Sequence, residues 1–109
     1  MIYLASPYTP HGGESVQERT DAVARVTARL MRQGYVVFSP IVHSHYIADQ
    51  LPDDLRLDHE FWMRQDLPIL RRSDKLVVLC LPGWERSRGV RREIAAATAV
   101  GIPIEYLYE

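Results

Sequence analysis

The chain has 109 residues, which suits one compact domain, and its 47% apolar and 25% charged residues are ordinary for a globular protein. Its formal net charge of −1 does not indicate a nucleic-acid polymer or an anionic membrane as partner. No apolar run approaches the ~20 residues that a membrane-spanning helix needs, and the single cysteine, Cys80, excludes an intrachain disulfide. We therefore expect one cytoplasmic domain over residues 1–109, without a signal peptide or a membrane-spanning helix.

The first half of the chain predicts a strand, a helix and a second strand, over residues 2–5, 15–34 and 35–38. The first strand ends before Pro7, because proline cannot donate a hydrogen bond to a neighbouring strand. Ser15 followed by Glu18 is a capping-box signature for the start of the helix, and Gly34 supplies its end. The loop over 6–14 then falls at the edge of the sheet where ligands bind.

The second half predicts two more strands, over 75–81 and 102–108, and two more helices, over 59–72 and 89–101. Asp58 is a candidate N-cap for the first of these helices, and Pro68 should kink or split it. The segment before them carries a weaker signal, for a short helix over 44–50 and a turn over 52–54. Cys80 is expected to be a small buried residue inside its strand.

Strands that alternate with helices predict an α/β fold. We expect a three-layer sandwich around a short parallel sheet of about four strands in the order 2-1-3-4, as in flavodoxin-like and Rossmann-like folds. Pro103 and Glu105 suggest that the last strand lies at a sheet edge.

The segment 73–93 combines a buried strand, a polar loop and the start of a helix. In open α/β sheets, ligands bind outside the carboxyl ends of the strands, and the first turn of a helix offers unpaired N–H groups. Glu93 falls in or just after that first turn. Its carboxylate is therefore expected to face the crevice.

Two carboxylates are the strongest candidates for chemistry. Asp66 falls on the apolar side of its helix, where a carboxylate is costly unless it is paired or used. Glu93 lies beside a helix N-terminus, which favours its ionised form. Ordinary roles are open for both, since Asp66 could bond a loop backbone and Glu93 could be a solvated acid. If both reach one crevice, they suit a carboxylate nucleophile and a positioning or acid/base partner.

Phosphate-binding and metal-binding candidates are weaker. Ser87, with the N–H groups around Gly89, could hold a phosphate or sugar oxygen, or could simply cap the helix. A basic cluster nearby could meet a phosphate or be solvated; it comprises Arg86, Arg88, Arg91 and Arg92. His43 and His45 lack the further ligands of a zinc site, so we expect neither a metal nor a cofactor.

Aromatic side chains at the same edge are candidates for a pocket that holds a flat base. They are Tyr3, Tyr8 and Trp84. The alternative is ordinary packing, which is the usual role of an aromatic residue in a small α/β domain.

Three segments that span nearly the whole chain carry a family resemblance: IYLASPY, HEFWMRQDLPILRRSDKLVVL and SRGVRREIAAATAVGIPI. The most specific parts are the D-L-x-x-L-x-x-S-D pattern that ends at Asp74 and the G-x-x-x-E pattern from Gly89 to Glu93. In order and spacing, these segments resemble the nucleoside 2-deoxyribosyltransferase superfamily, in particular a branch of small proteins within it.

The resemblance implies cleavage of the N-glycosidic bond of a 2′-deoxynucleoside or its 5′-monophosphate, a small-molecule partner. By analogy, Glu93 attacks the anomeric carbon and Asp66 positions the sugar and the nucleophile. Tyr3 matches the aromatic residue of the first strand in that family, and Ser6 and Pro7 match the loop beneath the substrate.

One departure bears on the substrate. The nucleoside transferases resemble one another in carrying an aspartate six residues before the nucleophile, where this chain has Ser87. A neutral hydroxyl near four arginines repels a phosphate less than an aspartate does, so Ser87 looks more like the monophosphate-hydrolysing relatives. Trp84, Arg91 and Arg92 leave open that the pocket has changed.

Three hypotheses follow: an N-glycosidase or deoxyribosyltransferase that uses Glu93, a non-catalytic nucleotide-binding module on the same fold, and a metal-dependent hydrolase built on His43 and His45. The first is favoured. The resemblance also implies a homo-oligomer, with which the aromatic Tyr106 and Tyr108 of the expected edge strand agree.

Overall fold

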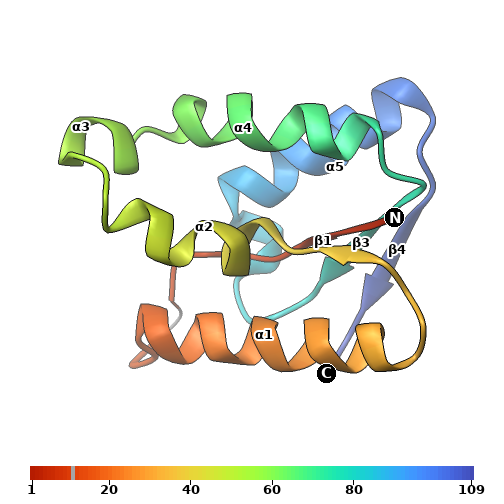
Figure 1. Ribbon diagram of the computed structural model, residues 1–109, viewed down its shortest axis with the longest axis horizontal. Coiled ribbons are helices and arrows are strands. Elements are labelled where there is room, and N and C mark those ends of the chain that lie inside the picture. The colour runs from red at the N-terminus through yellow and green to blue at the C-terminus, as the bar shows by residue number, and fades with distance from the viewer. Residues whose placement is uncertain (11) are drawn as a thin grey trace.

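The structure is a computed structural model that describes residues 1–10 and 12–109, so His11 of the predicted 6–14 loop lies outside it. Helices and strands alternate along most of the chain (Figure 1). In order, the elements are β1 (Ile2–Ala5), α1 (Val16–Arg32), β2 (Val37–Phe38), α2 (Pro40–Ala48), α3 (Asp53–Arg56), α4 (His59–Arg71), β3 (Lys75–Leu79), the 3-10 turn η1 (Trp84–Arg86), α5 (Arg88–Val100) and β4 (Ile104–Leu107).

The four strands form one parallel sheet in the order β2-β1-β3-β4, as predicted. The two central strands pair over the full length of β1, with Tyr3 opposite Leu76 and Ala5 opposite Val78. β4 is an edge strand, as expected, and pairs with β3 only. Because all strands run the same way, their carboxyl ends and the loops that follow them meet at one edge of the sheet.

The helices lie on both faces of the sheet, which confirms the α/β sandwich (Figure 1). Alternate side chains of the central strands point to opposite faces. One face packs against α1 through Ile2, Leu4, Val23, Val26, Val77 and Leu79. The other packs against α4 and α5 through Tyr3, Ala5, Met63, Leu67, Leu70, Leu76, Val78, Val90 and Ala97. Neither α1 nor any other helix among the described residues is both long and apolar enough to cross a bilayer.

Helix ends follow the predicted capping residues. The Ser15 hydroxyl accepts a hydrogen bond from the Glu18 N–H at 3.0 Å and begins α1. The Asp58 side chain caps α4 in the same way. Gly101 ends α5 with a φ of 76°, a left-handed conformation that favours glycine.

Several predicted elements differ from the observed ones. Residues 40–48 form α2, four residues earlier than the predicted 44–50 helix, because the Ser39 hydroxyl caps the first turn and a proline is tolerated there. The predicted 52–54 turn is followed by the single helical turn α3. Pro68 does not split α4, which is continuous and is held on the sheet by the buried Leu67 and Leu70.

The predicted strands were too long at their ends. The strand β2 starts two residues later than predicted, and β3 ends two residues earlier. The strand β4 starts two residues later and ends one residue earlier than predicted. β3 ends at Leu79, so Cys80 lies just beyond the strand and is only partly buried, contrary to the prediction. Its sulfur contacts the Val78 carbonyl oxygen at 3.5 Å.

Candidate active site

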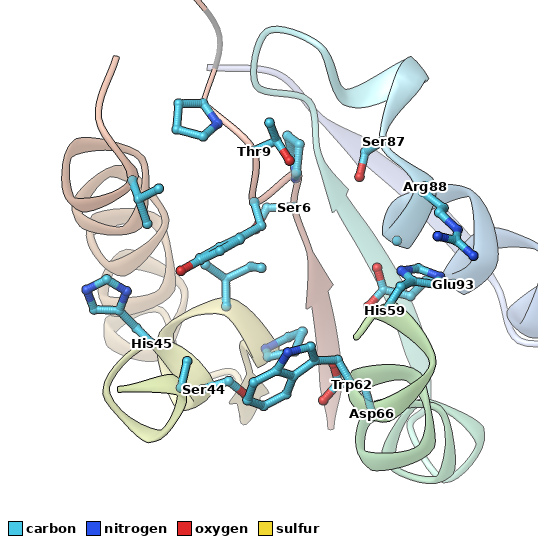
Figure 2. Close-up of a pocket in the computed structure, with 18 of the residues that line it drawn as sticks. Ser6, Thr9, Ser44, His45, His59, Trp62, Asp66, Ser87, Arg88 and Glu93 are labelled. Atoms are coloured by element: carbon cyan, nitrogen blue, oxygen red, sulfur yellow. The ribbon is translucent and has the colours of Figure 1, made fainter. Parts of the chain in front are cut away.

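A cavity of about 750 Å³ opens at the carboxyl edge of the sheet (Figure 2). Its walls come from the loop after β1, the start of α1, helix α2, the end of α3, the first turns of α4 and α5, and the loop that joins β3 to α5. This is the edge where the sequence places the ligand. Asp66 and Glu93 both line the cavity, as do Ser6, Pro7, Ser87 and Gly89.

Glu93 lies in the second turn of α5 and is 4% exposed. The Tyr3 hydroxyl donates a hydrogen bond to its Oε2, and this bond joins the first strand to the last helix. The solvated acid that was one alternative for Glu93 is therefore excluded. The carboxyl group is held at the inner wall of the cavity with one oxygen fixed.

Burial raises the pKa of Glu93 to about 8. The hydrogen bond from Tyr3 opposes this rise, and the charge of Asp66 adds to it. The helix N-terminus was expected to favour the ionised form, whereas loss of hydration on burial is the largest effect on Glu93 and favours its protonated form.

Asp66 lies on the buried side of α4, as predicted, and is 7% exposed. Burial raises its pKa to about 6. Over residues 1–10 and 12–109, no hydrogen bond joins its carboxylate to a loop backbone, which was its ordinary alternative. Asp66 and Glu93 thus form a pair of carboxyl groups whose protons leave at different pH values.

Tyr3 stands behind Glu93 and does not line the cavity. Its side chain is fully buried, and its pKa is raised by burial and by the nearby Glu93 and Asp66. The ring packs on Phe38 with 5.7 Å between centroids. Tyr3 was predicted to contact substrate, but this position lets it act on Glu93 rather than on a ligand in the cavity.

Arg19 fixes the two loops that flank the carboxyl pair. Its side chain is fully buried and donates hydrogen bonds to the carbonyls of Pro7, at 3.4 Å, and Pro82, at 3.0 Å. It also forms a 2.7 Å ion pair with Glu14. One guanidinium therefore holds the loop after β1 and the loop after β3 together.

A comparison with protein families matches residues 1–109 to the family described as Domain of unknown function (DUF1937). The chain belongs to the DUF1937 family. A search of curated proteins found no match.

In this DUF1937 protein, the predicted ligand contacts fall on both sides of the carboxyl pair. Ser6 is buried beside the cavity, and its hydroxyl has no hydrogen-bond partner within the described part of the chain. The Ser87 hydroxyl caps α5 by accepting from the Val90 N–H at 3.2 Å, and it also lines the cavity. The position of Ser87 therefore allows both predicted roles, as the cap of α5 and as a ligand contact.

The four arginines divide into two pairs. Arg86 and Arg88 line the cavity, and neither side chain has a hydrogen bond or ion pair with any described residue. Arg91 donates to the Glu85 carbonyl, and Arg92 pairs with Glu60, both outside the cavity lining. Only the first pair is placed to meet a ligand.

The histidines and aromatic residues named from the sequence lie at different places. His45 lines the cavity, with its Nε2 3.0 Å from Gln17 Oε1, whereas His43 is exposed and packs on Phe38. No cluster of three metal-ligating side chains occurs among the residues that the structure describes. Tyr8 lines the cavity, but Trp84 packs on Tyr106 at the edge strand.

His59 and Trp62 line the cavity from the start of α4, and neither was predicted to be a site residue. A signal for His59 was present. It directly follows the N-cap Asp58 and lies seven residues, or two helical turns, before Asp66, which places both on one face of the helix. Figure 2 shows His59 and Arg88 on the same side of the cavity as Glu93, with His45 on the opposite side.

Proposed function

We propose that this protein cleaves the N-glycosidic bond of a 2′-deoxynucleoside or its 5′-monophosphate, with Glu93 as the nucleophile. The observation that carries the proposal is the pairing of Glu93 and Asp66 in one cavity, with Tyr3 fixing Glu93 from behind. The resemblance to the nucleoside 2-deoxyribosyltransferase superfamily supplies the substrate class.

In the proposed reaction, an ionised Glu93 oxygen forms a bond to the anomeric carbon as the bond from that carbon to the base nitrogen breaks. The base leaves with the electron pair and takes a proton from solvent. Water or a second base then attacks the same carbon, loses its proton to solvent and releases the Glu93 carboxylate. A carboxylate next to the sugar stabilises the cationic character that develops there.

Tyr3 and Asp66 have separate roles in this scheme. The Tyr3 hydrogen bond stabilises the ionised form of Glu93 and leaves the other oxygen to attack. Asp66 has the lower pKa of the two carboxyl groups, so it ionises first and can hold a sugar hydroxyl. Ser6, at the loop after β1, offers a further hydrogen bond to the substrate.

The test is release of free base from the four 2′-deoxynucleosides and their 5′-monophosphates, followed by chromatography at pH 8. We expect Glu93→Gln and Glu93→Ala to lose about 10³-fold or more of the activity, because the nucleophile is gone. Glu105→Gln is the matched control, since it removes an exposed carboxylate from β4. Trapping of a sugar ester on Glu93 by mass spectrometry would confirm the nucleophile.

A non-catalytic nucleotide-binding module is the second candidate, favoured by Arg86 and Arg88, which line the cavity and have no partner among residues 1–10 and 12–109. No base release from any substrate, combined with saturable nucleotide binding to a folded protein, would replace the first proposal by this one. The cytoplasmic location and the homo-oligomer stay predictions. Neither is needed for the base-release test.

A further inference from the structure

Two helices begin at the same wall of the cavity. α4 begins at His59 and α5 at Arg88, each has 13 residues, and both first residues line the cavity. The helices pack on the same face of the sheet, so the positive ends of their dipoles lie at one edge (Figure 1). Helix N-termini of this kind favour an anion.

His59 adds an observation that points to a ligand. Its Nε2 is buried and has no hydrogen-bond partner among the described residues, although it lies beside the cavity. A buried polar atom without a partner is costly, and a ligand that bonds it removes that cost. Ser6 Oγ is the other such atom in the described chain, and it also lies beside the cavity.

The charges around His59 show what kind of ligand fits. Burial lowers the pKa of His59, the charges of Arg88 and Arg92 lower it further, and Glu60 and Asp58 act in the opposite direction. Both acids are engaged, since Glu60 pairs with Arg92 and Asp58 caps α4. The Arg88 side chain has no partner in the described chain, so its positive charge is uncompensated at the cavity.

We propose that His59 and Arg88 form an anion subsite between the first turns of α4 and α5, which binds a phosphate group. On binding, His59 takes one proton from solvent and becomes a charged donor to a phosphate oxygen, while Arg88 donates to another. The identification of this phosphate as the 5′-phosphate of the substrate rests on the proposed function. Binding of inorganic phosphate does not.

The first experiment uses the unmodified protein and inorganic phosphate in buffer of low chloride concentration. The imidazole signals of all four histidines are followed by NMR across pH, with and without phosphate. We expect saturable binding that raises the midpoint of His59 alone by at least one pH unit. Binding that leaves the His59 midpoint unchanged would overturn the proposal.

Variants then separate the subsite from general charge. Arg88→Gln and His59→Gln should each weaken phosphate binding at least tenfold. Arg91→Gln removes the same charge from the same helix but lies outside the cavity lining, so it should stay within twofold of the parent protein. His43→Gln is the corresponding histidine control. If Arg88→Gln and Arg91→Gln weaken phosphate binding equally, the binding reflects the general positive charge of α5. That result would contradict the proposed subsite.

Failure of this subsite and failure of the proposed function can be distinguished. Phosphate binding that persists in Glu93→Gln, without base release from any substrate, retains the subsite and rejects the glycosidase. The opposite result is base release without phosphate binding, equal for nucleosides and monophosphates and unchanged in Arg88→Gln. This result retains the glycosidase and rejects the subsite. Thermal unfolding of each variant shows whether a loss arises from misfolding, and the NMR titration needs no variant.

Discussion

The two faces of the sheet bury polar side chains in different ways. On the α1 side, Thr20 and Thr27 are buried with hydroxyls that donate to backbone carbonyls of their own helix at 2.8 Å, and Arg19 is buried against three partners. On the α4 and α5 side, the carboxyl groups of Asp66 and Glu93 are buried, and within the described residues only one hydrogen bond reaches them, from Tyr3 to Glu93.

This difference distinguishes buried polar side chains that support the fold from buried carboxyl groups that are available for chemistry. Polar groups on α1 have their hydrogen bonds satisfied inside the protein, and their burial costs little. Asp66 and Glu93 keep their protons to higher pH because hydration is lost without full compensation. Such a pair weakens the fold at neutral pH and is therefore best explained by what it does in the cavity.

The largest effect is expected in the pH dependence of stability after Glu93→Gln. Glu93 ionises near 4.5 when unfolded but near 8 when folded, so the folded state holds the proton longer and its stability falls as pH rises between these values. Gln has no such loss. The variant should gain stability over the parent at pH 8, on the order of a few kcal/mol, since one pKa unit is about 1.4 kcal/mol.

Denaturant unfolding at pH 4, 6 and 8 measures this gain. The difference between variant and parent should shrink toward zero below pH 4.5, where Glu93 is protonated in both states. Glu105→Gln serves as control, because its exposed ion pair with Lys75 contributes little at any pH. A Glu93→Gln protein that is less stable than the parent at pH 8 would contradict the buried, protonated state of this residue.

The sequence predicts the sheet order and the meeting of Asp66 with Glu93 because both depend on local patterns. The apolar periodicity places Asp66 on the buried side of α4. The parallel topology then brings the first turns of α4 and the start of α5 to the same carboxyl edge of the sheet. Caps such as Ser15 are read from neighbouring residues. These rules need no knowledge of distant contacts.

What the sequence does not predict depends on packing between distant segments. Tyr3 and Glu93 are 90 positions apart, so neither their hydrogen bond nor the protonation of Glu93 can be derived from the residues around each. The same holds for Arg19, which joins loops after two different strands. The division of the arginines into two pairs depends on Glu60 and Glu85, whose positions relative to α5 only the fold determines.

A smaller effect is expected for Tyr3→Phe, which removes the Tyr3 hydrogen bond that lowers the pKa of Glu93. If ionised Glu93 is the nucleophile, base release rises with pH up to about 8 in the parent and only at higher pH in the variant. At pH 7 we expect a loss of about tenfold or more, since a hydrogen bond to a charged group is worth about 1.5–3 kcal/mol. Rate profiles from pH 5 to 10 measure the midpoint.

The control for this profile is Tyr35→Phe, an exposed tyrosine away from the cavity. Its midpoint should match the parent. A Tyr3→Phe protein with a lower rate and an unchanged midpoint would mean that Tyr3 holds the shape of the site without tuning the carboxyl group. A profile that falls with rising pH would instead assign Glu93 as an acid, against the proposed nucleophile.

The smallest effect is expected on the opposite face, for Thr27→Val. The Thr27 hydroxyl donates to the Val23 carbonyl, but this carbonyl also accepts the helical N–H of residue 27, so removing the hydroxyl leaves no buried group without a partner. We expect a change below about 1 kcal/mol at every pH, measured by the same denaturant unfolding. Base release should match the parent. A pH-dependent change in stability would show that buried polarity on α1 is coupled to the carboxyl pair, and the two faces would then not be independent.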